Sequence, residues 1–184
     1  MRLAAAVAAA ALALSLPAQA REQDGVQVPE TADLSGTALV LNGAGLRSKL
    51  FIKVYVGALY LPQKAGDAAA IVAADAPWLV QLTFKRDVDK KSILGAFKEG
   101  FEKNSAADLA TLQPALARLE AGLKDLKTGD LLAFAYQPGT GTTVTAPGVA
   151  PVVLEGPVTA RALLRNWIGD HPADGDLKKG MLGQ

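Results

Sequence analysis

The sequence predicts an α+β domain in which an antiparallel β-sheet is packed on one side by helices. Three observations support this prediction: strand-like segments near the start of the chain, a central block of helical apolar periodicity, and a strand-rich region followed by one more helix. The chain of 184 residues shows no internal repeat and no second linker. This length suits one domain with one core.

The first 20 residues, MRLAAAVAAAALALSLPAQA, have the pattern of a secretory signal peptide. A basic Arg2 precedes an apolar run, and Ala18-Gln19-Ala20 supplies the small residues of a cleavage site. The run is too short for a membrane span. We therefore expect a periplasmic or secreted protein, cleaved near Ala20. Residues 21–32 are polar and are expected to form a flexible leader or an edge strand, and residues 33–184 form the domain.

The first patterned strand is expected over residues 38–42, followed by a glycine-rich turn at residues 43–45, whose glycines permit a positive φ or the close approach of another chain segment. Residues 50–61 are rich in β-branched and aromatic side chains and predict one long strand. Arg47 lies between the turn and this strand. A permanent cation beside an apolar surface is unfavourable unless an anion meets it, which makes Arg47 a candidate binding residue.

The long strand has two different faces. Alternation places Ile52, Val54 and Val56 on one face, which we expect to be core. Lys53 and Tyr55 lie on the other face, where polar head groups among apolar neighbours are typical of a ligand cleft. Periodicity alone is equally compatible with a solvated sheet face for these two residues.

The central block predicts helices and one strand. A short helix is expected near residues 67–74 and a strand over residues 78–86. Asp87 or Asp89 can cap the next helix. Its apolar residues recur every fourth position, namely Ile93, Phe97 and Phe101.

A leucine-rich helix is expected next. Ser105 and Asp108 resemble a capping box at its start, Pro114 can kink it, and Thr128-Gly129 ends it. The leucine stripe is interpreted as core, because it is too short for a coiled-coil seam.

The C-terminal part predicts a three-stranded antiparallel meander and a helix. The strands are expected over residues 131–136, 142–146 and 149–155, with Pro-Gly turns between them. Pro157 begins the last predicted helix and Gly169 ends it.

Composition excludes several classes of function. Lys and Arg number 19 against 18 Asp and Glu, and loss of the signal peptide leaves 18 of each, so nothing favours nucleic acid. Cysteine is absent and His171 is the only histidine, so we expect no metal and no cofactor. No serine has a nucleophile-elbow context, and the glycines at 43–45 precede a strand rather than a helix, unlike a nucleotide-binding loop.

Four segments together resemble the chalcone isomerase superfamily, with the greatest similarity to its exported bacterial chalcone isomerase-like branch. These segments are GAGLRSKLFIKVYVGALYL, GAFKEGFEKN, LEGPVTARALLRNWIGDHP and DLKKGMLG, and the resemblance covers residues 33–183. It implies the open-faced β-sandwich of that superfamily.

The resemblance also implies roles for single residues. In the plant enzymes an arginine after the Gly-Ala-Gly sequence supports an oxa-Michael ring closure, and Arg47 matches it. Tyr55 stands where those enzymes have a threonine that polarises the substrate carbonyl. Thr159 or Ala160 falls near a serine or threonine of the final helix. The tyrosine and asparagine of the central region have no clear equivalent.

Three functions remain open from the sequence. The favoured one is a non-catalytic binder of a small hydrophobic anion such as a fatty acid, with Arg47 as anchor and Lys53, Tyr55 and Thr159 as supporting residues. The second is an isomerase, an intramolecular lyase of chalcone isomerase type, with Arg47 and Tyr55 as catalytic residues. The third is a scaffold without a ligand. The sequence leaves the oligomeric state open.

Overall fold

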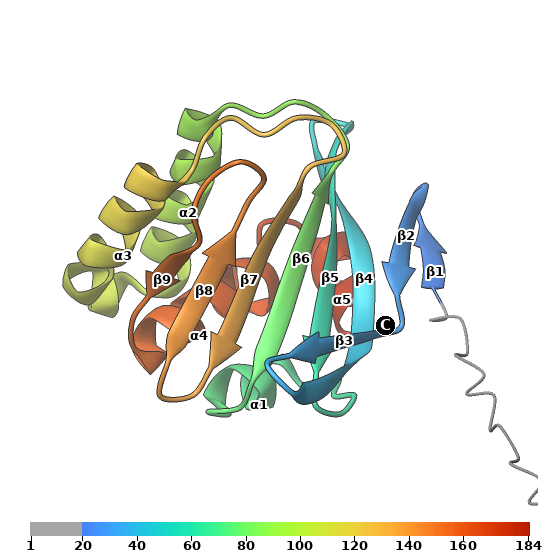
Figure 1. Cartoon of the computed structure of the whole chain (residues 1–184), viewed down its shortest axis with the longest axis horizontal. Helices are drawn as coiled ribbons and strands as arrows, with labels where there is room; N and C mark the ends of the chain where they lie inside the picture. Colours follow the sequence, from blue (N-terminus) through green and yellow to red (C-terminus); the bar gives the residue numbers. More distant parts are fainter. Residues whose placement is uncertain (1–19) are drawn as a thin grey trace, which may run out of the picture.

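Seven strands form one antiparallel sheet in the computed structural model, which describes residues 20–184 (Figure 1). The strands are β3 (Thr31–Leu34), β4 (Thr37–Lys49), β5 (Ile52–Leu61), β6 (Trp78–Phe84), β7 (Leu131–Gln137), β8 (Gly141–Thr145) and β9 (Val152–Leu154). Their order in the sheet is their order in the chain. Each strand thus pairs antiparallel with its predecessor, and the predicted C-terminal meander is confirmed.

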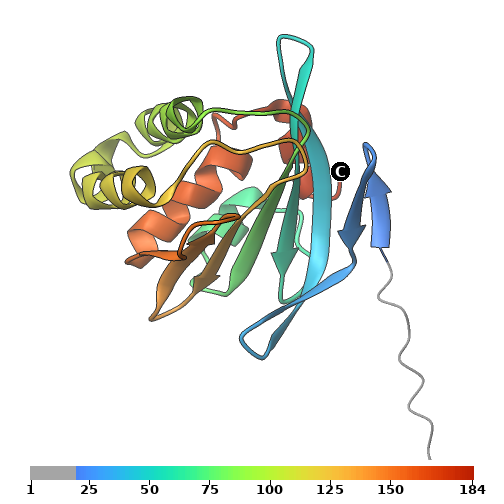
Figure 2. The same ribbon diagram turned by 45° about the horizontal axis from the view of Figure 1, so that its top comes forward.

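The helices pack against one side of this sheet, which confirms the predicted α+β class (Figures 1 and 2). They are α1 (Ala68–Ala73), α2 (Lys90–Asn104), the 3-10 helix η1 (Ala106–Asp108), α3 (Leu109–Gly122), α4 (Pro157–Ile168) and α5 (Gly175–Met181). In the part of the chain that the structure describes, no helix is both long and apolar enough to cross a bilayer. The predicted signal peptide lies almost wholly outside the described residues.

Two predicted helix starts are confirmed by their caps. The Asp67 carboxylate accepts hydrogen bonds from the backbone N–H groups of Ala69 and Ala70 at the start of α1. The Asp89 carboxylate accepts from the N–H of Ser92 at 2.8 Å at the start of α2. These side chains satisfy backbone donors that have no partner within the helix.

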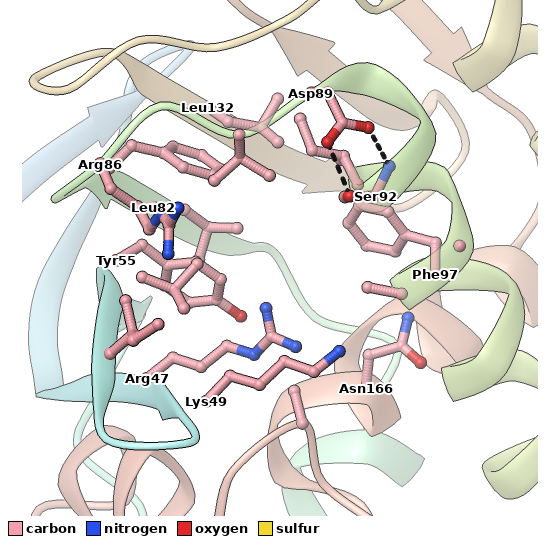
Figure 3. Close-up of a pocket in the computed structure, with 18 of the residues that line it drawn as sticks. Arg47, Lys49, Tyr55, Leu82, Arg86, Asp89, Ser92, Phe97, Leu132 and Asn166 are labelled. Carbon is pink, nitrogen blue, oxygen red and sulfur yellow. Dashed lines mark hydrogen bonds between the residues drawn. The ribbon is translucent and has the colours of Figure 1, made fainter.

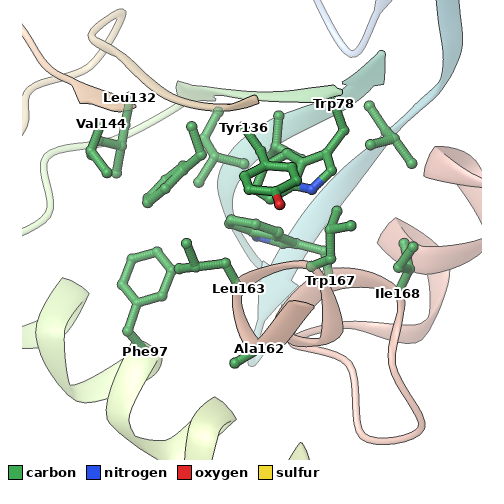
Figure 4. Packing of buried hydrophobic residues seen from close by; sticks show 14 of the residues in the cluster. Trp78, Phe97, Leu132, Tyr136, Val144, Ala162, Leu163, Trp167 and Ile168 are labelled. Atoms are coloured by element: carbon green, nitrogen blue, oxygen red, sulfur yellow. The ribbon is translucent and has the colours of Figure 1, made fainter. Parts of the chain in front are cut away.

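The main core lies between the sheet and the helices, and Trp167 of α4 is at its centre (Figure 4). The Trp167 ring lies 6.0 Å from the ring of Phe97 in α2 and 5.2 Å from that of Phe134 in β7, measured between centroids. A smaller cluster occupies the opposite face of the sheet, where Val28 joins Val56 and other apolar residues. Both faces of β5 are therefore buried.

The segment expected as a flexible leader or an edge strand contains a β-hairpin. Residues Ala20–Gln23 form β1 and residues Val26–Pro29 form β2. Asp24 and Gly25 connect these strands with positive φ angles of 50° and 76°, the conformation that a tight hairpin turn requires. Val28 is buried, which gives this hairpin an apolar contact with the domain.

The leucine-rich helix is shorter than predicted. Ser105 and Asp108 make no side-chain capping bond, and α3 starts at Leu109 after the η1 turn. It ends at Gly122 rather than at Thr128-Gly129. Leu123, the residue after this helix, is already extended, and Leu126 pairs its backbone with Val88. This pairing keeps the chain after Gly122 out of the helix.

The glycines at 43–45 do not form the predicted turn, because β4 runs through them without interruption. They permit close packing of α5, a helix that the sequence did not predict. A Cβ atom at Gly43 would collide with the carbonyl oxygen of Gly180, and one at Gly45 would lie 2.9 Å from that of Leu177. The turn falls instead at Leu50 and Phe51, inside the segment predicted as a single strand.

Candidate functional site

A cavity of about 590 Å³ lies where the ends of β4, β5 and β6 meet the helices α2 and α4 (Figure 3). Its apolar wall comes from both layers. The residues of this wall include Val54, Leu82, Phe84, Ile93, Phe97 and Leu132. Its polar groups come from several different elements and face this apolar wall, a combination found in small-molecule sites.

Arg47 projects from β4 into this cavity (Figure 3). Its guanidinium carbon lies 5.5 Å from the ring centroid of Tyr55, the residue opposite it in β5, within the range of a cation–π contact. Its Nε atom is buried and has no hydrogen-bond partner. Among residues 20–184, Arg47 forms no ion pair. A buried donor without a partner is costly, so this guanidinium favours an added acceptor.

A β-bulge at Val54 decides which residues of β5 reach the cavity. Arg47 is opposite Tyr55 while Ser48 is opposite Lys53, so Val54 is an extra residue in β5. Because a bulge reverses the alternation of side chains, Val54 and Tyr55 both face the helical side. The simple two-face prediction for this strand was therefore wrong at its start.

The same bulge places Lys53 outside the cavity. Its ammonium group pairs with the Asp24 carboxylate at 2.9 Å, next to the β1–β2 hairpin. This bond is the main cause that lowers the pKa of Asp24. The predicted ligand-binding role of Lys53 is thus not supported by its position.

Tyr55 is buried at the cavity wall, as the cleft prediction required. Its hydroxyl oxygen accepts a hydrogen bond of 3.2 Å from the indole N–H of Trp167. Burial raises the pKa of Tyr55, although Arg47 and Trp167 act in the opposite direction. The phenol is therefore neutral and keeps its own O–H to donate.

Thr159 does not line the cavity. It is buried in the first turn of α4, with 3% of its surface exposed, and the cavity meets this helix near its other end at Asn166 and Trp167. Residues 159 and 166 are two turns apart on the helix, which separates Thr159 from Arg47.

Asn166 is the functional candidate that sequence reasoning missed. Its side chain lines the cavity, is 5% exposed, and has neither a donor for its Oδ1 nor an acceptor for its Nδ2 (Figure 3). The signal was weak, because Asn166, three positions after Leu163, lies at the edge of the apolar face of the predicted helix. A polar residue at such a position calls for a hydrogen-bond partner.

Three cations and three carboxylates line the cavity, and the carboxylates have hydrogen-bond partners of their own. Lys49 and Arg86 line the cavity with Arg47, and Lys49 forms no ion pair in residues 20–184. The acidic residues of the lining are engaged elsewhere. The carboxylate of Asp87 bonds Lys127, that of Asp89 bonds Ser92, and that of Glu99 bonds Lys103.

These bonds keep the carboxyl groups ionised and occupied. The hydrogen bond from Lys127 is the main cause that lowers the pKa of Asp87, and that from Lys103 lowers the pKa of Glu99. The cavity therefore offers a guanidinium, a neutral phenol and an amide to a ligand, while the carboxylates of its lining already have hydrogen-bond partners.

The fold is similar to that of a fatty-acid binding protein of Arabidopsis thaliana. The two structures superpose with a TM-score of 0.66 at 18% sequence identity, covering 89% of this chain and 96% of that one. At this identity the likeness shows a shared fold. No curated protein matches the chain in sequence.

A family model described as chalcone isomerase-like matches residues 20–183, nearly the whole of the described structure. The match includes the strand that carries Arg47, the bulged strand with Tyr55, and the helix with Asn166. The chain belongs to the chalcone isomerase-like family.

Proposed function

We propose that this protein binds a small hydrophobic anion, such as a fatty acid, without chemical conversion. The observation that carries the proposal is the buried, unpartnered Nε of Arg47 in a cavity that also has an apolar wall. A carboxylate can accept two parallel hydrogen bonds from a guanidinium, and charge-assisted bonds of this kind are strong. The fatty-acid binding protein with the same fold supports the proposal.

The rest of the cavity suits the two ends of such a ligand. Tyr55 and Asn166 are further polar partners for the carboxylate, while Phe97, Ile93 and Leu132 provide an apolar surface for its tail. The cavity volume of about 590 Å³ lies within the range of small-molecule sites. Burial of methylene groups supplies affinity, and the carboxylate contact supplies orientation.

The proposed setting is the periplasm or the cell exterior. Support for export comes from the N-terminal sequence alone, with its basic residue, apolar run and Ala18-Gln19-Ala20 site. N-terminal sequencing of the protein recovered from an exporting host tests this proposal. We expect the exported protein to begin near Arg21. Exported protein that still begins at Met1 would contradict the proposal.

Native mass spectrometry and equilibrium titration test the ligand class. We expect wild-type protein to bind a long-chain fatty acid more tightly than the corresponding methyl ester. Arg47→Met should weaken binding of the acid by about tenfold to a hundredfold, the equivalent of one charge-assisted contact, and should leave binding of the ester nearly unchanged. Equal affinity of wild-type protein for acid and ester would contradict the proposal.

A matched control is available at Arg118. This arginine is exposed, pairs with Glu155 at 2.9 Å, and lies outside the cavity lining. Arg118→Met removes the same charge and should not change either affinity. Equal losses in Arg47→Met and Arg118→Met would indicate a general charge effect.

One observation favours a second candidate, an intramolecular lyase. Arg47 and the Tyr55 hydroxyl are donors on the same cavity wall, and such donors can stabilise negative charge that develops on a carbonyl or phenolate oxygen. Loss of the visible absorbance of an added chalcone, faster with wild-type protein than with Arg47→Met, would support this candidate. Neither turnover nor binding would favour a scaffold role.

A further inference from the structure

The β4–β5 hairpin projects beyond the body of the domain (Figure 2), and its tip carries exposed apolar residues. Leu50 is 83% exposed, Phe51 is 102% exposed and the adjacent Ile52 is 49% exposed. Neighbouring apolar residues that protrude together into solvent mark an interaction site.

The backbone of this tip makes these residues unexpected. Leu50 and Phe51 form a two-residue turn between Lys49 and Ile52, with φ angles of 49° and 66°. Turns of this kind favour Asn-Gly, and bulky side chains rarely adopt positive φ. The fully exposed ring of Phe51 does not pack against the domain and is free to contact another surface.

The tip also borders the cavity. Leu50 and Ile52 belong to its lining, together with the cations Lys49 and Arg86. Lys49 is without an ion pair in residues 20–184, and Asp87, which follows Arg86, is already paired with Lys127. An apolar tip with cations beside it matches the layers of a lipid surface, in which acyl chains lie below anionic head groups. A protein partner would require about 800 Å² of surface on this side, far more than a two-residue turn offers.

We propose that this tip docks on an anionic lipid bilayer, with Phe51 inserted at the boundary between head groups and acyl chains. Docking would bring the cavity mouth to the surface from which a hydrophobic anion enters or leaves. The suggested purpose of docking rests on the proposed function. Docking itself rests on the tip and its cations.

Vesicle binding tests this proposal directly. Because the chain contains no cysteine, Leu50→Cys can carry a single environment-sensitive fluorophore beside the intact Phe51. We expect the fluorophore emission to shift to shorter wavelength with mixed vesicles of phosphatidylglycerol and phosphatidylcholine, and to shift less with phosphatidylcholine alone. High salt should reduce the shift seen with the mixed vesicles. An unchanged spectrum with the anionic vesicles would overturn the proposal.

Co-sedimentation of unlabelled protein adds an independent measurement. Phe51→Gly suits the positive φ of the turn and removes the inserted ring, so vesicle binding should fall by about tenfold. Val153→Ser, a change at another exposed apolar residue, is the control and should bind like wild type. Equal vesicle binding by wild type and Phe51→Gly would overturn the proposal.

Fatty-acid titration in the absence of vesicles separates the two proposals. Phe51 does not line the cavity, so Phe51→Gly should bind a soluble fatty acid like wild type. Protein that binds the acid but no vesicle overturns docking and leaves the proposed function intact. Protein that docks through Phe51 but binds no acid supports docking and contradicts the proposed function.

Discussion

The indole N–H of Trp167 in α4 donates a hydrogen bond of 3.2 Å to the hydroxyl of Tyr55 in β5. This bond joins the centre of the helical layer to the cavity wall. It occupies an acceptor site of the Tyr55 oxygen and so directs the remaining O–H to other partners. The cavity thus obtains a neutral donor next to the guanidinium of Arg47.

Tyr55→Phe should lower both stability and ligand affinity. The substitution leaves the buried indole N–H of Trp167 without an acceptor, which costs about 1–3 kcal/mol in the free energy of unfolding. It also removes a proposed donor to the carboxylate. Urea unfolding measures the first effect and fatty-acid titration the second.

Tyr60→Phe is the matched control for this prediction. The Tyr60 hydroxyl is buried without a hydrogen-bond partner on the opposite face of the sheet. Its removal should leave stability unchanged or raise it slightly, with no effect on ligand affinity. A destabilisation as large as that of Tyr55→Phe would show that the Trp167 bond is not the cause.

Asn166→Leu should stabilise the unliganded protein while it weakens ligand binding. Both polar atoms of this amide are buried without partners, so an apolar side chain of similar size removes a penalty of about 1 kcal/mol or more. The ligand loses a polar contact at the same time. The midpoint of urea unfolding should rise and fatty-acid affinity should fall.

Thr142→Val separates the gain in stability from the loss of ligand affinity. The hydroxyl of Thr142 is also buried and unpartnered, but this residue of β8 does not line the cavity. We expect the gain in stability without the loss of affinity. If Asn166→Leu instead unfolds more easily than wild type, the amide is part of the structural core rather than of the binding site.

The sequence predicted the class of fold and most helices and strands, because these follow from local periodicity and caps. Asp67, Asp89 and Pro157 begin helices where their chemistry predicts. The site was predicted less completely. Arg47 and Tyr55 meet as expected, but the bulge at Val54 sends Lys53 to the other face. A single extra residue in one strand cannot be recognised from alternation when both faces are apolar.

The helix α5 escaped prediction for a related reason. Its seven residues, GDLKKGM, carry little periodic signal, and its stability comes from contact with the glycines of β4. These glycines were interpreted as a turn, because their sequence pattern does not distinguish a positive φ from a close approach of another segment. The tertiary contact decides between the two interpretations.

Gly43→Ala should destabilise the protein by about 1–3 kcal/mol or more, because the new methyl group would collide with the carbonyl oxygen of Gly180 and displace α5. Urea unfolding measures the loss. Gly175→Ala, in the first turn of the same helix, is the control, since a methyl group there meets no atom within 4 Å. If Gly43→Ala is as stable as this control, α5 does not depend on close packing against β4.

Alkaline pH should destabilise the protein through its tyrosines, of which the chain contains three. Burial is the main cause that raises the pKa of each: that of Tyr60 and that of Tyr136 to about 12, and that of Tyr55 also upward. For Tyr136 a hydrogen bond to Asp75 adds to the effect.

The folded and unfolded states bind different numbers of protons at alkaline pH, and this difference sets the direction of the change in stability. In the unfolded chain these phenols lose their protons near the ordinary pKa of 10, whereas the folded protein retains them. Above this pH the unfolded state binds fewer protons, so the free energy of unfolding decreases as the pH rises toward 12. Below pH 10 all three tyrosines are protonated in both states, so they do not make the free energy of unfolding depend on pH.

Ultraviolet absorbance of tyrosinate, recorded during alkaline titration, should stay low in native protein at pH 10 and rise only near pH 12 or on unfolding. Absorbance at pH 10 equal to that of urea-unfolded protein would contradict the burial of these hydroxyl groups.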